Sequence, residues 1–170
     1  MIRQYLRSAR MLAVATVLMA CSAAFGDTMP QESPGNSVTY DSALAQATGA
    51  DERGMRRYVL VILKSSNTRV PDGPRRDAMF KGHFANMERL ASEGKLVMAG
   101  PLDGVDGWRG LFIFAVNDIE EAKALTATDP VVVEGEMVAE FHKFYGSAAL
   151  MLINDAHARL VKPKEPALER

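Results

Sequence analysis

Three short segments of the chain are continuously apolar, which is typical of buried strands. Residues 58–63 (YVLVIL) lie between charged or polar neighbours on both sides. Residues 96–102 (LVMAGPL) form the second segment, in which Pro101 marks the edge or the end of a strand. Residues 111–116 (LFIFAV) follow a glycine-containing turn and can pair with the second segment as a hairpin. We therefore predict three strands.

Between the first two segments, apolar residues recur at the spacing of a helix. Gly94 ends this pattern, as glycine commonly does at a helix C-terminus. The apolar stripe has members three or four residues apart, which places them on one face: Phe80, Phe84, Met87 and Leu90 or Ala91.

A second helix is predicted after the third strand. Asp118 and Glu121 have the spacing of a capping box, which satisfies free amides at a helix start. The buried face of this helix would contain Ile119, Ala122 and Leu125 or Thr126. After Asp129 and Pro130, residues 136–145 (EMVAEFHKFY) alternate between apolar and polar and predict a fourth strand.

The element order is β-α-β-β-α-β, the ferredoxin-like split βαβ arrangement of class α+β: one antiparallel sheet with two helices on one face. Its second face would lack cover, and we expect that four strand residues cannot all turn toward the helices: Val59, Val61, Phe112 and Phe114. Two copies of the chain would bury this surface, so we expect a homodimer. Residues 147–160 add a C-terminal stripe at helical spacing, expected to pack on the sheet edge or the partner.

The N-terminus has the pattern of a secretory signal peptide in residues 1–26, and we expect an exported, periplasmic or secreted protein. Three arginines precede an apolar run of about ten residues, half of the roughly twenty that span a bilayer, so we expect no transmembrane segment. Two cleavage readings stay open. Ala24 and Gly26 suit release of a soluble chain beginning at Asp27, whereas residues 18–21 (LMAC) resemble a bacterial lipobox that would attach lipid to Cys21.

The composition narrows the function classes. A single cysteine excludes an internal disulfide framework and a cysteine-rich metal module. Removal of residues 1–26 lowers Lys and Arg from 20 to 17 against 21 Asp and Glu, so the net charge of −1 becomes about −4. An acidic chain is repelled by phosphates, and we expect no nucleic-acid partner. Residues 27–57 have linker composition, residues 58–160 form the domain with a core at 58–145, and residues 161–170 a disordered tail.

Histidine and aspartate supply the candidate chemistry, because imidazole is the side chain that titrates near neutral pH. His83 borders the apolar stripe, where it could either cap the core or carry chemistry, and Asp129 before Pro130 could be ordinary turn chemistry. We expect His142 and His157 at the surface. No metal-binding histidine motif occurs in the sequence, and we predict neither a metal site nor a cofactor.

Several motifs taken together resemble the YCII (YciI-like) family. They are HFANMERL at 83–90, EGKL at 93–96, AGPL at 99–102, EA at 121–122 and TDP at 128–130. The family pattern is a histidine on the first helix, a glycine eleven residues later, a glycine-proline strand and an aspartate-proline pair after the second helix. All four occur here in that order.

This resemblance implies a dimeric α/β barrel and a catalytic pair formed by His83 and Asp129. Known chemistry in the family includes elimination of chloride from a chlorinated hydroxyquinol. Asp129 would accept the N–H of His83 and fix its tautomer, so that His83 could move a proton on a small molecule. The pocket would be formed by Gly100, Pro101, Met98 and Phe112, with Phe114 beside them, and Arg75 or Arg76 could attract an anionic substrate or remain a solvated ion pair.

Three functions remain open at this point. The chain could be a lyase-like or hydrolase-like enzyme, a non-catalytic small-molecule-binding module, or a dimeric interaction domain. An enzyme requires contact between His83 and Asp129 and a cavity beside them.

Overall fold

The computed structural model describes residues 39–163. The expected signal peptide, the cleavage positions and Cys21 lie outside these residues, as do residues 27–38 of the expected linker and 164–170 of the expected tail. None of the helices in the described part is both long enough and apolar enough to cross a bilayer.

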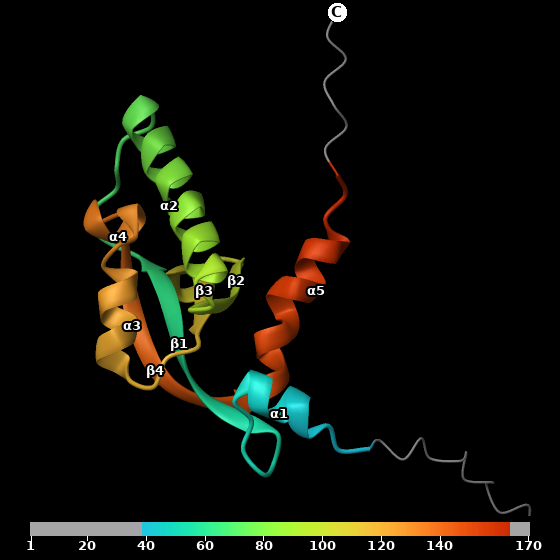
Figure 1. Cartoon of the computed structure of the whole chain (residues 1–170). Helices are drawn as coiled ribbons and strands as arrows, with labels where there is room; N and C mark the ends of the chain where they lie inside the picture. The colour runs from blue at the N-terminus through green and yellow to red at the C-terminus, as the bar shows by residue number, and fades with distance from the viewer. Residues whose placement is uncertain (1–38, 164–170) are drawn as a thin grey trace, which may run out of the picture. The chain divides into compact units, whose positions relative to one another are not determined.

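Four antiparallel strands form one sheet in the order β2-β3-β1-β4 (Figure 1). They are β1 (Met55–Ser65), β2 (Leu96–Pro101), β3 (Trp108–Phe114) and β4 (Met137–Ser147). Strand β3 lies between β1 and β2, which helix α2 (Pro74–Ser92) connects. This is the predicted split βαβ order, so the ferredoxin-like α+β fold is confirmed. Strands β1 and β4 extend beyond the predicted segments 58–63 and 136–145, because residues 55–57 pair with residues 145–147.

Helices α2, α3 (Ile119–Thr126) and α4 (Pro130–Val133) cover one face of the sheet (Figure 1). The Asp118 side chain accepts a hydrogen bond of 2.8 Å from the N–H of Glu121 and so caps α3, as predicted. Gly94 has a φ of +68°, the left-handed conformation expected of a residue that ends a helix.

The residues expected to divide between the two faces are all on the helix-covered face. Val59 is opposite Phe114, Val61 is opposite Phe112, and all four are buried in one core. Directly opposed residues share a face, and so do residues two positions apart on a strand. The expectation that these four could not all face the helices was therefore wrong.

The second face has a smaller core of its own, covered by the C-terminal segment. This segment consists of a 3-10 helix η2 (Ala148–Leu152) and helix α5 (Ile153–Leu160). Leu150 and Met151 pack against the buried Tyr58, Val97 and Ile113. Asn154 on α5 donates a hydrogen bond of 2.8 Å to the carbonyl oxygen of Leu96, on the edge strand β2. Part of the second face is thus covered within a single chain.

Residues 40–57 of the expected linker contain regular structure. Asp41 caps helix α1 (Ser42–Thr48), and strand β1 starts at Met55. The guanidinium of Arg56 donates to the carbonyl oxygen of Thr48 at 3.0 Å and so connects α1 to the sheet. A further 3-10 turn, η1 (Val105–Gly107), lies between β2 and β3.

Candidate functional site

The row of α2 that faces the sheet differs from the predicted apolar stripe. Its buried residues, at spacings of four, three and four, are Met79, His83, Asn86 and Leu90. The predicted residue Phe84 is 55% exposed. The pattern missed the buried row because two of its four members are polar. Burial of a histidine and an asparagine here requires hydrogen-bond partners.

Asp129 lies between α3 and α4 and is completely buried. Pro130 follows it, and the backbone of Asp129 is extended as a residue before proline prefers (φ −83°, ψ 123°). Its Oδ1 atom accepts a hydrogen bond of 3.1 Å from the N–H of Val131, which caps α4. Asp129 therefore caps a helix, as turn chemistry predicts, and its side chain is also completely buried.

His83 and Asp129, 46 residues apart in the chain, are in direct contact. The Nδ1 atom of His83 lies 2.9 Å from Oδ1 and 2.8 Å from Oδ2 of Asp129. His83 is 9% exposed. Within the described residues no hydrogen-bond partner meets the other ring nitrogen, Nε2, and this atom is not sealed from solvent.

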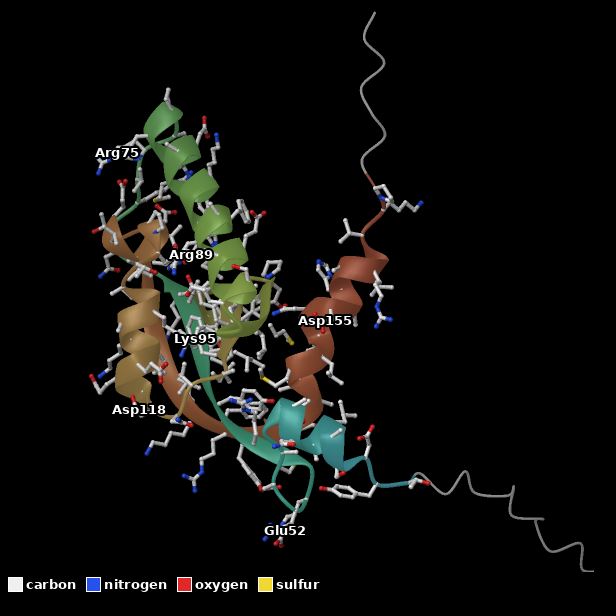
Figure 2. The ribbon with its side chains drawn as sticks, viewed as in Figure 1. Glu52, Arg75, Arg89, Lys95, Asp118 and Asp155 are labelled. Carbon is white, nitrogen blue, oxygen red and sulfur yellow. The ribbon has the colours of Figure 1, made fainter. Side chains whose placement is uncertain are left out.

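Close contacts between α2 and the Asp129 loop hold the pair together. A Cβ atom placed on Gly82 would lie only 2.9 Å from Cγ of Pro130, so the absence of a side chain lets the proline ring rest on the helix. On the next turn, Asn86 Oδ1 accepts hydrogen bonds from Arg89 at 2.7 Å and from Thr128 at 3.0 Å. Figure 2 shows Arg89 on the side of α2 that faces α3.

A cavity of about 280 Å³ opens beside His83. Its apolar side chains come from α2 and three strands: Leu63, Phe80, Phe84, Met87, Phe112 and Met137. Gly100, Pro101 and Gly110 form a further part of the wall. The predicted pocket residues Gly100, Pro101 and Phe112 therefore lie at the cavity.

Met98, predicted for the same pocket, lies on the other face of the sheet. The pairing of β2 with β3 shifts register between Leu96 and Met98, which is a bulge. Val97 and Met98 consequently both pack in the second core. Phe114 is fully buried in the first core and does not line the cavity.

Three phenylalanine rings surround the imidazole of His83. Phe112 is stacked at a centroid distance of 6.0 Å, Phe80 is edge-on at 6.3 Å and Phe84 is tilted at 5.4 Å. The site thus has one titratable ring in an apolar, mainly aromatic environment.

A model of the YCII-related domain matches residues 57–141, half of the chain. The chain belongs to the YCII-related domain family. The match includes His83, Asp129 and every residue that lines the cavity. One similar solved structure is 5-chloro-2-hydroxyhydroquinone dehydrochlorinase (TftG) from Burkholderia phenoliruptrix AC1100, in complex with 2,5-dihydroxybenzoquinone. Its sequence is 18% identical, the TM-score is 0.36, and the alignment covers 51% of this chain and 92% of that one. The search of curated proteins found no match.

The arginines proposed to attract a substrate to the YCII-related domain are engaged elsewhere. Arg75, at the N-terminal end of α2 in Figure 2, forms an ion pair of 2.7 Å with Glu134. Arg76 pairs at 2.7 Å with the buried Glu136, which also accepts the N–H of Val70 at 2.8 Å. The hydrogen bond from Arg76 lowers the pKa of Glu136 below its usual value.

Arg109 is a charged residue at the cavity that the sequence pattern did not predict. It lies on β3, lines the cavity and is partly buried. In the sequence it belongs to a Trp-Arg-Gly turn with no distinguishing pattern, and only the pairing of β3 with its neighbours places it at the cavity.

The remaining histidines of the YCII-related chain lie at the surface. His142 is on β4 and contacts Glu140 at 2.8 Å, while His157 is exposed on α5. Within residues 39–163, no group of three or more potential ligands is arranged to hold a metal ion.

Proposed function

We propose that this YCII-related domain is a lyase-like or hydrolase-like enzyme that performs acid–base chemistry on a small molecule bound in the cavity. His83 is the catalytic residue and Asp129 positions it. The observation that carries the proposal is the contact of 2.8 Å between a buried carboxylate and a histidine that borders an apolar cavity.

The contact with Asp129 determines which nitrogen of His83 is available as a base. An ionised carboxylate can only accept hydrogen bonds, so Nδ1 of His83 must donate to it. In the neutral imidazole the lone pair then resides on Nε2, the nitrogen without a hydrogen-bond partner among the described residues. Asp129 therefore orients the ring and selects the tautomer that presents a base to the cavity.

An elimination illustrates the reaction class. Nε2 takes a proton from a carbon of the substrate, and the electron pair of that C–H bond forms a new double bond. The leaving group departs with its own electron pair. The imidazolium then releases its proton to the departing anion or to water, which restores the starting state.

The test is a screen of small single-ring and carbonyl compounds with the wild-type chain and with His83→Ala. We expect turnover by the wild type and a loss of about 10²- to 10⁴-fold in the variant. His142→Ala is the matched control, because it removes a histidine that lies on β4, away from the cavity. Turnover unaffected by His83→Ala would exclude this mechanism.

A non-catalytic small-molecule-binding module is the second candidate function. The same cavity supports this function, because a ligand could bind there without a proton transfer to or from His83. Saturable binding of compounds that the wild type never converts would favour this module over the enzyme.

We also propose that the chain is exported and acts as a homodimer. Trp108 and Val138 on the second face are 41% and 50% exposed, which leaves apolar surface on this face for a second copy. Sedimentation that finds only monomer at micromolar concentration would contradict the dimer. The mass of the mature chain would distinguish a start at Asp27 from a lipid-modified Cys21.

A further inference from the structure

We propose that the cavity binds an anionic, single-ring aromatic compound whose oxyanion is held by Arg109. This inference names the substrate class of the same site and, for the position of the reacting atoms, rests on the function proposed above.

The charge of the cavity lining favours an anionic ligand. Among the side chains that line the cavity, only His83 and Arg109 are polar. Within residues 39–163, no carboxylate oxygen lies within 4 Å of the Arg109 guanidinium, and its single side-chain hydrogen bond is a long one of 3.5 Å to Ser65 Oγ. The cavity therefore presents a guanidinium that has several donors free for a ligand.

The buried carboxylate on which the charge of Arg109 acts already has other partners. Glu136 accepts from Arg76 and from the N–H of Val70. These bonds lower the pKa of Glu136, and the charge of Arg109 is a further, smaller cause. Arg109 therefore interacts electrostatically with Glu136 but forms no ion pair with it. A carboxylate on the ligand would supply the missing partner.

The size and the walls of the cavity favour a single aromatic ring. Benzene fills a cavity of about 150 Å³, so a cavity of about 280 Å³ suits one ring with its substituents. Phe80, Phe84 and Phe112 provide flat apolar walls, and aromatic rings stack favourably on such walls. Gly110, next to Arg109, has no side chain that could fill the cavity. A Cβ atom at this position would lie 3.1 Å from the carbonyl oxygen of Gly100.

The combination selects against other ligands. A cation would be repelled by Arg109, and a neutral ring would leave the guanidinium without a charged partner. A ring-borne oxyanion satisfies the guanidinium while its ring rests on the phenylalanines and approaches Nε2 of His83.

The experiment compares three ring compounds of nearly equal size and planarity: benzoate, benzamide and benzamidine, with charges of −1, 0 and +1. Their binding to the full-length chain is measured by titration calorimetry. We expect benzoate to bind about tenfold more tightly than benzamide, as a charge-assisted hydrogen bond implies, and benzamidine to bind most weakly. Equal binding of benzoate and benzamide would overturn the proposal.

Variants assign this preference to Arg109. Arg109→Gln should abolish the preference for benzoate over benzamide, and Arg109→Lys should retain part of this preference. Arg75→Gln is the control, since Arg75 pairs with Glu134 and does not line the cavity. A preference that survives in Arg109→Gln would assign the anion to another site.

Backbone amide signals locate the ligand independently. Benzoate should shift the signals of Gly100 and Gly110, which line the cavity. Shifts confined to the polar groove around Arg53 and Arg57 would contradict the proposal.

Failure of this inference and failure of the proposed function give different results. If benzoate is preferred through Arg109 but no ring compound is converted, the ligand class holds and the enzyme does not. If neutral compounds are converted through His83 and benzoate is not preferred, the enzyme holds and the ligand class fails.

Discussion

Two histidine–carboxylate pairs lie on opposite faces of the same sheet. His83 approaches Asp129 to 2.8 Å on the helix-covered face, and His142 approaches Glu140 to the same distance on the second face. The side chains of the first pair are 11% and 0% exposed, whereas those of the second are 50% and 44% exposed.

The difference shows that contact distance alone does not indicate a site. Water competes for the groups of an exposed pair and screens their charges, so such pairs contribute little to stability. In the buried pair the carboxylate has fixed partners, the ring has one defined orientation and a cavity adjoins it. Burial and the adjoining cavity distinguish these two pairs.

The largest expected effect is that of Asp129→Asn on turnover. Because the carboxylate selects the tautomer of His83, its loss should reduce kcat by about 10²- to 10⁴-fold on the substrate found by screening. Glu140→Gln, the matched change on the second face, should leave kcat unchanged. A comparable loss in both variants would show that the two pairs do not differ in function.

The same variants can be compared without a substrate. Nitrogen-15 NMR of the imidazole should find His83 as the Nδ1–H tautomer in the wild type and a changed tautomer in Asp129→Asn. An unchanged His83 signal would mean that Asp129 does not set the tautomer.

Gly82→Ala should have the next largest effect, on stability. In an open helix this change stabilises by about 1 kcal/mol, but here the new Cβ would contact the Pro130 ring at 2.9 Å. We therefore expect a net destabilisation of about 1–3 kcal/mol, measured by urea unfolding. Gly100→Ala is the control, since nothing lies within 4 Å of its Cβ position. Stabilisation by Gly82→Ala would contradict the tight packing of the Asp129 loop on α2.

The pH dependence of stability should be smaller and should also differ between the faces. The hydrogen bond from Arg76 lowers the pKa of Glu136 from its usual value of 4.5. The folded-state value lies below the unfolded one, so this contribution is present above about pH 4.5 and is lost as the pH falls through the folded-state value. Glu136→Gln should flatten the decline of stability in this acidic range. An unchanged decline would exclude Glu136 as its source.

The smallest effect is expected for Glu140→Gln on the same acidic decline. Lys64 first, and then His142, lower the pKa of Glu140, but the side chain is 44% exposed to solvent. Solvent screening should make the curve of this variant nearly coincide with that of the wild type. A change as large as that in Glu136→Gln would show that exposure does not separate the two glutamates.

Local patterns predicted most elements but fewer of the site residues. Apolar runs and caps depend on neighbours in the chain, so the strand order and the Asp118 cap could be predicted from them. The positions of Met98 and Arg109 depend on a bulge and on strand register, which the local pattern does not reveal.

The sequence by itself determined the βαββαβ order and pointed, through family motifs, to His83 and Asp129 as a pair. Periodicity and capping are properties of short segments, and motifs are properties of residue identity. Only the tertiary structure decided that these two side chains meet at 2.8 Å, that Val59, Val61, Phe112 and Phe114 share one face, and that Arg109 borders the cavity. Each of these facts joins segments far apart in the chain, and register and packing between segments bring them together.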